Sequence, residues 1–576
     1  MAPGSEAAAA TFTGKLRVGV LVGSSRVLQW ITMLLEDLVS SKRVQLVGVA
    51  ALPAFEEQAD GPRPVTGALL AADRLLFTRR AGVLQPVDVS VWARRHAIPL
   101  DALAAGPGVA RAWVADLQAG EPHVVLDLTG ADPPEEIAGA GQTVWRLRGV
   151  RVSTDDLCPQ RASVVKAVLG GSPTVAFELN ESAGVGSGDG RVTIGVCPTH
   201  PSSPLLTDAY LAASARQLIV RRLESLSLAR ASRGDAPAGV AGAVAPQRPQ
   251  AGPRPALGTQ PSQGSAGPLS LATAGARVLV RTLARQACKM AWEQQWFLMI
   301  GRQPSGLLLP DPRDLETLLP PPGRYWADPH IVEYEGLIHV FFEEFLYAER
   351  RGRIAVTTLD SAGRPGPVSV ALDLDSHLSY PDVFVHDGRL FMIPEGASAG
   401  RVDVYECRGG PRDWVFRRTL LHDTPLVDAS VVEWRGRWWL FGSLKKPAGL
   451  RTAELLLLYS ADDPVTGEWR EHRLSPLLAD VTNARPAGVP FRHGQKLYRL
   501  AQDGSRGYGS GIAINEVLRM DPAEYDERKV ASLSPAWDRR VCGVHTLNRA
   551  RDMVVMDGCR WVPRDLRRQR PDAMLD

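Results

Sequence analysis

The stretch YPDVFVHDGRLFMIPEG, residues 380–396, decides the fold of the second half of the chain. Apolar and polar residues alternate on both sides of Asp387-Gly388, which is typical of a β-hairpin with a tight turn. Asp382 falls near the start of the first strand and Glu395 at the end of the second, although strands tend to exclude Asp. We therefore expect both carboxyl groups at the same edge of one sheet.

The same arrangement recurs at intervals of roughly fifty residues. Each copy has a polar residue, a strand, a turn with a charged residue and a glycine, and an apolar or aromatic strand. The other copies are ADPHIVEYEGLIHVFFEEF (327–345), VDASVVEWRGRWWLFGS (427–443), ARPAGVPFRHGQKLYRLAQD (484–503) and the less regular GVHTLNRARDMVVMDG (543–558). A repeat of this length with about four strands is typical of a propeller blade. Five copies predict an all-β five-bladed β-propeller over residues 293–565, in which 293–302 adds an outer strand to the last blade.

A propeller brings the starts of its innermost strands to one end of a central channel. We therefore expect a shared polar site at that mouth, although any one of its acids alone is explained equally well as a turn cap. The first ring of this site is Asp328, Asp382, Asp428, Arg485 and His545, and the second is Glu343, Glu344, Glu395, Gln502 and Asp503.

Short motifs in this half resemble a known family. YWADPHI, FFEEF, HLSYPDVF, MIPEG, ARPAG, AQDGSRGYG and GVHTLN are similar to the N-terminal domain of plant glucosamine inositolphosphorylceramide transferases and its bacterial relatives, over about residues 290–565. In the plant proteins a glycosyltransferase domain follows, and no stretch of this chain resembles it. The resemblance implies a carbohydrate-related role and does not imply the sugar transfer itself.

The motif WADP at a blade start resembles, more distantly, the five-bladed propeller glycosidases. Those enzymes use an Asp of blade one as base or nucleophile, an Asp of blade two to tune pKa values, and a Glu of blade three as acid. Asp328 and Asp382 match the first two positions, whereas blade three offers Asp428, so that Glu395 is the nearest substitute for the acid. Paired carboxyl groups suit glycoside chemistry because one stays ionised while the other holds a proton. The residues expected to contact a sugar also include Tyr325, Trp326, His377, Tyr380 and Tyr508, although propeller aromatics more often serve packing.

The first half shows a different pattern. KLRVGVLVGSSRVLQWITMLLEDLVSSKRVQLVGVA (15–50) predicts a strand, a Gly-Ser turn, an amphipathic helix over 25–40 and a second strand. HVVLDLTG (123–130) predicts another parallel strand, and a helix around 206–228 closes the region. We therefore predict a Rossmann-like α/β domain over residues 15–228.

VVKAVLGGSPTVAFELNESAGVGSGDGRVTIG (164–195) resembles the part of the formyltransferase fold that follows that family's catalytic segment. The resemblance implies a formyltransferase-like fold for this domain. Those enzymes use an Asn, a His in an H-x-S-L-L-P loop and a downstream Asp. Here His123 precedes Val-Val, that loop is absent, and only Asp189 could match the Asp, so we expect the fold without the formyl-transfer activity.

Composition excludes several classes of protein. With 576 residues the chain is too long for one core, and 45% hydrophobic and 22% charged residues are typical of a globular protein. The 66 basic and 63 acidic residues give a net charge of +3, without the concentrated basic field that nucleic-acid binding requires. The six cysteines form no C-x-x-C motif, which predicts no zinc site and no disulfide framework. We expect neither a metal nor a cofactor.

No apolar stretch is long enough to span a membrane and the first residues lack a signal-peptide layout, so we expect a cytoplasmic protein. Its wealth of Ala, Arg, Gly and Pro suggests a bacterial, GC-rich genome. The Ala/Pro/Gly-rich stretch over 229–270 predicts a disordered linker, and residues 1–14 and 566–576 predict loose ends. The connecting helix over 271–292 carries a basic stripe that could meet an anionic membrane surface, which would suit a lipid-linked glycan: Arg277, Arg281, Arg285 and Lys289.

Three functions remain open from the sequence. The first is a protein that binds and processes a sugar or glycoconjugate at the propeller mouth, by hydrolysis or transfer of a glycosyl group. The second is a glycan-binding scaffold without catalysis, which the missing blade-three Glu favours. The third is an amino-sugar formyl- or acyltransferase with the propeller as specificity module, against which the absent loop counts.

Overall fold

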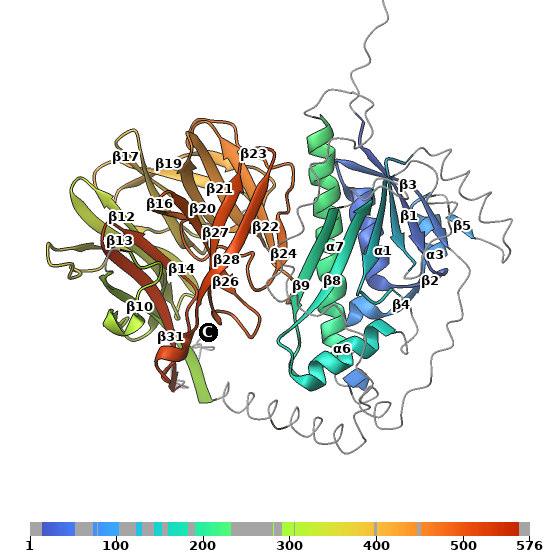
Figure 1. The fold of residues 1–576 in the computed structure, drawn as a ribbon, viewed down its shortest axis with the longest axis horizontal. Helices are drawn as coiled ribbons and strands as arrows, with labels where there is room; N and C mark the ends of the chain where they lie inside the picture. Colours follow the sequence, from blue (N-terminus) through green and yellow to red (C-terminus); the bar gives the residue numbers. More distant parts are fainter. Residues whose placement is uncertain are drawn as a thin grey trace, which may run out of the picture.

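The computed structural model describes most of the chain (Figure 1). The described residues are 14–51, 73–75, 77, 79–98, 100–102, 122–129, 143–152, 159–182, 191–231, 280, 291–303, 306–396, 400–445 and 451–563. The basic stripe, the C-terminal tail, Asp189, and nearly all of the expected linker and connecting helix lie outside them. Within the described part, no helix is both long and apolar enough to cross a membrane.

The expected fold class, a separate Rossmann-like α/β domain followed by a five-bladed propeller, is wrong. The described residues are mainly β, with 51% strand against 18% helix, and they show a four-bladed propeller-like arrangement without a clear Rossmann-like domain. The two errors have different physical causes, one at the third blade and one at the fifth repeat.

The strands of the first half do not form a sheet of their own. The parallel strands β1 (Leu16–Val22), β3 (Val44–Ala51), β5 (Leu100–Ala102), β6 (Val124–Leu128) and β7 (Thr143–Arg148) are followed by antiparallel β8 (Thr174–Ser182) and β9 (Arg191–Pro198). The far edge of β9 then pairs in parallel with β24 (Leu478–Asp480) of the propeller region. One 12-stranded sheet therefore joins both halves, which hydrophobic periodicity along either half cannot reveal.

Helices and a small strand pair cover this sheet: α1 (Gln29–Ser40), α3 (Val89–Arg95), α6 (Pro159–Gly170), α7 (Pro204–Ala231), β2 (Arg26–Leu28) and β4 (Pro86–Asp88). Ser203 precedes α7 and its hydroxyl accepts the N–H of Leu206 at 3.0 Å, and Pro204 occupies the first helical position. Trp30 and Leu34 of α1 lie in the same buried core as Leu218 of α7.

Four blades follow one another along the chain. The first blade consists of β12 (Arg324–Tyr334), β13 (Leu337–Leu346), β14 (Arg351–Leu359) and β15 (Ser369–Leu372), and the second of β16 (Ser379–His386), β17 (Arg389–Glu395), β18 (Val402–Cys407) and β19 (Trp414–Leu421). The third consists of β20 (Leu426–Trp434), β21 (Arg437–Leu444), β22 (Leu455–Ala461), β23 (Arg470–Glu471) and β24. The fourth consists of β25 (Phe491–His493), β26 (Lys496–Asp503), β27 (Gly511–Met520) and β28 (Tyr525–Leu533). The third blade is the one that continues into the N-terminal sheet.

The hairpin turns of the first three blades have the predicted geometry. Asp387 and Gly388 have φ values of 49° and 70°, and two successive left-handed residues match the twist of the flanking strands. The same signs occur at Glu335-Gly336 and Arg435-Gly436.

The fifth repeat does not form a blade of this kind. It belongs to a sheet of β11 (Glu316–Leu318), β10 (Trp292–Arg302), β31 (Met553–Pro563), β29 (Val541–Gly543) and β30 (Leu547–Ala550), whose strands come from both ends of the region. β10 pairs with β31 from Trp292 opposite Pro563 to Arg302 opposite Met553. The expected pairing of residues 293–302 with the last strands is therefore confirmed, and it joins the beginning of the propeller region to its end.

Contacts of two arginines on α7 link the N-terminal half to the third blade. Arg222 forms an ion pair with Glu181 of its own half at 3.0 Å and donates to the carbonyl oxygen of Arg473 at 3.1 Å. Beside it, Arg221 forms an ion pair with Glu471. Since these groups are largely shielded from solvent, their contacts stabilise the association of the two halves.

Candidate functional site

The first three blades begin with the same backbone irregularity. The pairing register shifts between Ala327 and His330 in β12, and inside the shift Asp328 has a φ of 51°. The same shift and positive φ occur at Tyr380 in β16 (41°) and Asp428 in β20 (53°). Such values are uncommon outside glycine and persist only where the surroundings hold them. Asp328, Tyr380 and Asp428 are therefore structural equivalents.

The expected equivalence of Asp382 with Asp328 is wrong. Asp382 lies two residues beyond Tyr380, at the position that His330 has in the first blade. Its fully buried carboxyl accepts the N–H of Val431 at 2.8 Å, and its other oxygen lies 3.9 Å from Nε2 of His330. Burial raises the pKa of Asp382 to about 8. This acid is packed between blades.

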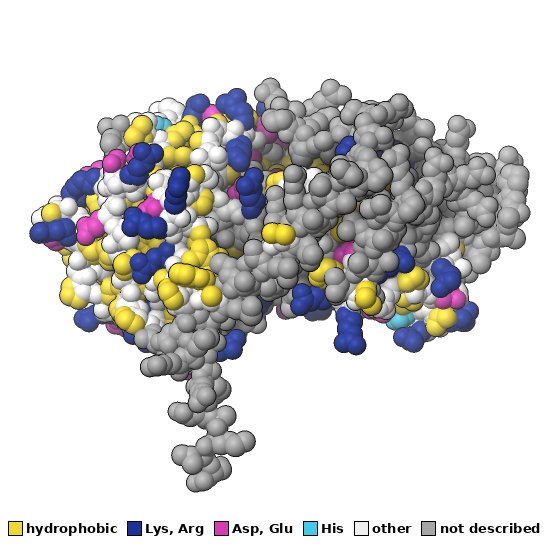
Figure 2. All heavy atoms as spheres, turned by 90° about the horizontal axis from the view of Figure 1, so that it is seen from below, with side chains coloured by type: hydrophobic (Ala, Val, Ile, Leu, Met, Phe, Trp, Pro, Cys, Tyr) yellow, Lys and Arg dark blue, Asp and Glu magenta, His cyan; other side chains and the backbone are white. Residues whose placement is uncertain are grey.

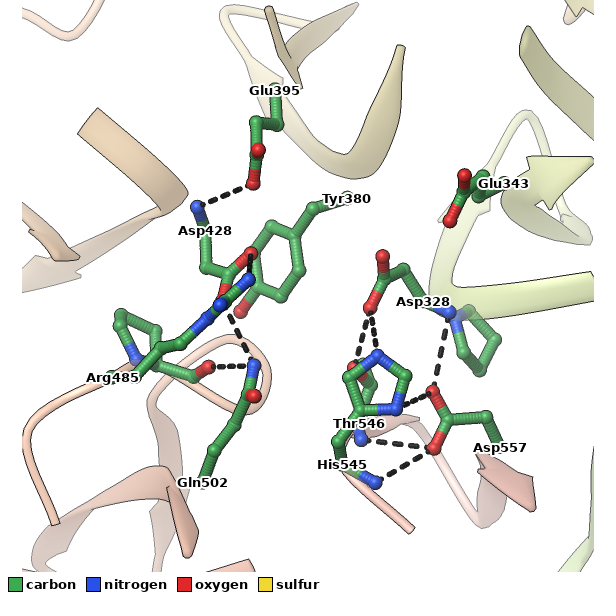
Figure 3. Close-up of polar contacts among 12 residues, drawn as sticks. Asp328, Glu343, Tyr380, Glu395, Asp428, Arg485, Gln502, His545, Thr546 and Asp557 are labelled. Carbon is green, nitrogen blue, oxygen red and sulfur yellow. Dashed lines mark hydrogen bonds and ion pairs between the residues drawn. The ribbon is translucent and has the colours of Figure 1, made fainter. Parts of the chain in front are cut away.

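Asp328 is one end of a buried chain that also contains the imidazole of His545 and the carboxylate of Asp557 (Figure 3). Oδ1 of Asp328 accepts the hydroxyl of Thr546 at 2.9 Å and lies 2.9 Å from Nε2 of His545. Nδ1 of His545 lies 2.9 Å from Oδ2 of Asp557. The chain joins β12 to the segment before β30 and to β31.

The charges in this chain support one another. Burial alone would raise the pKa of Asp328, but His545 and the Thr546 hydroxyl outweigh it and lower that pKa to about 2. Burial alone would lower the pKa of His545, but Asp557 and Asp328 raise it to about 10. At neutral pH Asp328 is an anion held by an imidazolium.

Asp428 is neutralised by its own partners. Arg485 donates to both of its carboxylate oxygens, with Nη2 to Oδ1 at 3.2 Å, and Gln502 donates from Nε2 to Oδ2 at 2.8 Å. The backbone N–H of Asp428 in turn donates to Oε2 of Glu395 at 3.1 Å. The sequence-predicted Asp428, Arg485, Gln502 and Glu395 thus come together (Figure 3).

Two glutamates at the ends of second strands differ from these anions. Burial, and then the neighbouring Asp328 carboxylate, raise the pKa of Glu343 well above its ordinary value. Burial, and then Asp428, raise the pKa of Glu395 in the same direction. A site that holds an ionised Asp328 beside carboxyl groups that retain protons separates acid and base roles.

Tyr325 and His377 lie at Glu343. The Tyr325 hydroxyl donates to Oε1 of Glu343 at 3.1 Å, and Nε2 of His377 lies 3.7 Å from the same oxygen. The His377 side chain is 44% exposed, so this side of the site reaches solvent.

Tyr508 forms an accessible aromatic wall. The residue is 51% exposed, and its ring centre lies 4.7 Å from that of His545 and 5.7 Å from that of Trp296. The guanidinium of Arg485 lies 5.4 Å from the ring centre. An exposed aromatic face beside buried polar groups is suited to the apolar face of a sugar ring.

Glu344 and Trp326 have a structural role. Glu344 accepts hydrogen bonds from Arg324 at 2.8 Å, from Arg353 at 2.8 Å and from the Trp326 indole at 3.2 Å. Successive residues of a strand point to opposite faces of the sheet, so Glu344 lies on the face opposite to that of Glu343. Neither Glu344 nor Trp326 joins the cluster around Asp328.

Asp503 and Tyr380 also have local partners. The carboxylate of Asp503 accepts the N–H of Ser505 at 2.9 Å, as a turn cap does. The fully buried Tyr380 shares a hydrogen bond of 2.8 Å with the hydroxyl of Ser430 in the next blade.

Sequence reasoning missed Asp557, Thr546 and Trp296. Asp557 is followed by glycine after the apolar run of the second strand in its repeat, as Glu395 is, and this sequence match could have identified it. Trp296 carries no such signal, because it comes from β10, outside the repeat, and reaches His545 with ring centres 4.3 Å apart.

Among the described residues, Asp328, His545 and Asp557 are close enough to share a metal ion. However, the two ring nitrogens of His545 face different carboxylates. A ring that is protonated at both nitrogens has no lone pair for a metal. The arrangement therefore fits a bridging imidazolium better than a ligand set.

Residues 318–554 match the family model described as glucosamine inositolphosphorylceramide transferase 1, N-terminal. Glucosamine inositolphosphorylceramide transferase 1 of Oryza sativa subsp. indica is 33% identical over 210 residues, which is 36% of this chain and 28% of that protein. The protein of the same name from Arabidopsis thaliana is 30% identical over 212 residues, with the same coverage. The predicted resemblance is confirmed, and the chain spans about 28% of the length of these curated relatives.

Solved structures show more remote similarity. An α-L-arabinofuranosidase from Clostridium thermocellum has a TM-score of 0.28 at 14% identity, covering 36% of this chain and 74% of that one. A family 117 glycoside hydrolase from Zobellia galactanivorans has a TM-score of 0.30 at 13% identity, covering 46% and 91%. Similarity at this level supports no conclusion about the site.

Proposed function

We propose that the cluster around Asp328 binds a sugar or glycoconjugate and acts on a glycosidic bond, by hydrolysis or by transfer. The observation that carries this proposal is the gathering of buried carboxyl groups with opposite pKa shifts: the pKa of Asp328 is lowered by His545, and burial raises the pKa values of Glu343 and Glu395. The curated relatives of residues 318–554 support a glycan-related function.

Each carboxyl group has a chemical role in this proposal. Asp328, with its low pKa, acts as the base or nucleophile at the anomeric carbon or on a water. Glu395 donates a proton to the glycosidic oxygen, because its pKa is raised and its side chain is partly exposed. Glu343 is more deeply buried and holds Tyr325, which suits it to the support of Asp328.

A glycan-binding role without catalysis is the second candidate, and Asp428 favours it. This residue occupies the start of the third blade, and Arg485 and Gln502 neutralise and saturate its carboxylate. In that case the same cluster recognises hydroxyl groups and performs no chemistry.

The name of the relatives contains a sphingolipid-linked inositol phosphate, so we extend the proposal to a lipid-linked glycan as ligand. The basic stripe that would contact the membrane lies outside the described residues. We do not propose the formyl-transfer alternative, because it required a Rossmann-like, formyltransferase-like domain that the structure contradicts.

The first experiment is a thermal-shift screen of the full chain against glycans and nucleotide sugars, because a ligand of the native state raises Tm. The ligands found are then incubated with wild type, D328N and E395Q, and products are measured by mass spectrometry. Loss of a general acid should lower turnover by about 100-fold or more.

Turnover that survives in both variants would overturn the catalytic proposal. Binding without any turnover in the wild type would favour the scaffold. No ligand in the screen, together with full stability loss in both variants, would show that the acids only maintain the fold.

A further inference from the structure

The fully buried carboxylate of Asp557 accepts three backbone hydrogen bonds and forms an ion pair with His545. Its Oδ1 accepts the backbone N–H groups of His545 at 2.9 Å and Thr546 at 3.1 Å. Its Oδ2 accepts the backbone N–H of Asp328 at 3.3 Å and lies 2.9 Å from Nδ1 of His545. Asp557 therefore touches both the backbone of Asp328, at its strained φ, and the side chain that contacts the Asp328 carboxylate (Figure 3).

The two contacts of His545 determine its protonation. A neutral imidazole has one N–H and one nitrogen lone pair. Because each ring nitrogen lies 2.9 Å from an oxygen of a different carboxylate, a neutral ring would place an unprotonated nitrogen beside one of the anions. Only the imidazolium carries a positive charge that attracts both carboxylates.

We propose that Asp557 is a positioning residue of this site: it holds His545 as a bridging imidazolium and thereby keeps the Asp328 carboxylate ionised and oriented. The role of Asp328 in glycosidic chemistry rests on the proposed function, whereas the state of His545 does not. Without Asp557, one donor nitrogen would lose its acceptor, and the ring would become neutral with its remaining N–H toward Asp328.

Every charged group near His545 is consistent with this assignment. Asp328 from β12 and Asp557 from β31 contact the ring directly, and Glu343 from β13 interacts with it electrostatically. Arg485 lies behind the Tyr508 ring and is neutralised by Asp428, so it opposes the imidazolium only weakly. The remaining faces are covered by the rings of Tyr508 and Trp296.

The experiment measures the side-chain ¹⁵N shifts of histidines in the full chain between pH 5.5 and 9. Loss of a signal in H545Q identifies His545. We expect wild-type His545 to stay protonated at both nitrogens across this range. His330 and His472 are internal controls, because burial lowers the pKa of each to about 4 and keeps both neutral.

In D557N we expect the His545 titration midpoint to fall by about two pH units or more, since one of its two anionic partners is lost. D521N is the matched control: Asp521 also accepts two backbone N–H groups, from Ala523 and Glu524, and contacts a histidine through its carbonyl oxygen alone. D521N should leave the His545 signals unchanged.

A wild-type His545 that titrates near its ordinary pKa would overturn the assignment, and this measurement decides even if D557N fails to fold. An unchanged His545 midpoint in a folded D557N would also overturn it. For a ligand from the thermal-shift screen, the pH below which binding is lost should be higher in D557N than in wild type. If His545 behaves as expected and no sugar binds, the assignment stands and the proposed function fails.

Discussion

Tyr380 occupies in the second blade the position that Asp328 occupies in the first, with φ values of 41° and 51° in the same register shift. As a result Asp382, two residues further along, faces His330 and Val431 inside the protein. The backbone register therefore places Tyr380 where the sequence predicted an acid, and the acid that was expected there, Asp382, is buried.

We expect D382N to stabilise the protein at alkaline pH. Burial raises the folded-state pKa of Asp382 to about 8, above its unfolded value, so its contribution to stability is complete below the unfolded pKa and is lost as the pH rises toward 8. An asparagine keeps an acceptor for the Val431 N–H and does not ionise. The Tm gain of D382N over wild type should be small at pH 5.5 and reach about 2–4 °C at pH 8.5.

The pH dependence is measured by scanning calorimetry of both proteins in matched buffers. A gain that is equal at both pH values would contradict the assigned protonation of Asp382. A loss of stability at pH 8.5 would mean that the carboxylate has a partner outside the described residues.

Adjacent glutamates should respond in opposite ways. E343Q removes a carboxyl group whose pKa burial raises, so we expect unchanged or higher stability, increasingly so above the unfolded pKa. E344Q removes a carboxylate whose pKa the contacts with Arg324 and Arg353 lower despite burial. We expect it to lose about 2 kcal/mol at neutral pH, and less as the pH falls through the lowered pKa.

Chemical denaturation at pH 5 and pH 7.5 checks this pair, and the two variants serve as each other's controls. Ligand affinity should fall in E343Q and persist in folded E344Q. Equal destabilisation in both variants would assign Glu343 a purely structural role.

The features that the sequence predicted are local or repeated. The turn at Asp387-Gly388 follows from two residues, and the contacts of Asp328 with His545 and of Asp428 with Arg485 follow from the recurrence of these residues in the repeat. The site residues that resisted prediction depend on backbone register. Aligning Asp328-Pro329 with Tyr380-Pro381 would have placed Tyr380 correctly, whereas the shared Asp in YPDVF and WADPH suggested Asp382.

The parts of the fold that resisted prediction are non-local. The pairing of Ala479 with Gly195 joins strands almost three hundred residues apart, and no periodicity along the chain specifies a partner for an edge strand. Likewise, the fifth repeat resembles a blade in sequence, but its sheet also contains β11 from the beginning of the region and both β29 and β30 beside β31, so that it is not a meander of four consecutive strands.

Tyr508 should contribute to ligand affinity through its ring. We expect Y508A to weaken binding about fivefold and Y508F to retain it, since an aromatic contact contributes roughly 1 kcal/mol and needs no hydroxyl. F416A is the control, because Phe416 is similarly exposed, at 53%, on β19. Titration calorimetry with a ligand from the screen measures the three affinities. A Y508F variant as weak as Y508A would show that the hydroxyl acts instead of the ring face.

The continuous sheet changes what proteolysis should release. We expect limited proteolysis to cut first within residues 229–270, where the composition offers no core. The two fragments should then stay together on gel filtration, because β9 and β24 remain paired, Arg222 still donates to the carbonyl oxygen of Arg473, and Arg221 still pairs with Glu471.

R222A should separate the nicked fragments, since it leaves Glu181 buried without its cation and removes a bond to the third blade. Breaking a buried pair of this kind costs about 3 kcal/mol. R216A is the matched control: Arg216 also lies on α7 and binds Asp37 through two nitrogens, at 2.6 and 2.7 Å, but this contact stays within the N-terminal half, whereas Arg222 also donates to the carbonyl oxygen of Arg473. Nicked R216A should elute as one species. If nicked wild type already dissociates, or if nicked R222A stays associated, the joint between the halves does not depend on these contacts.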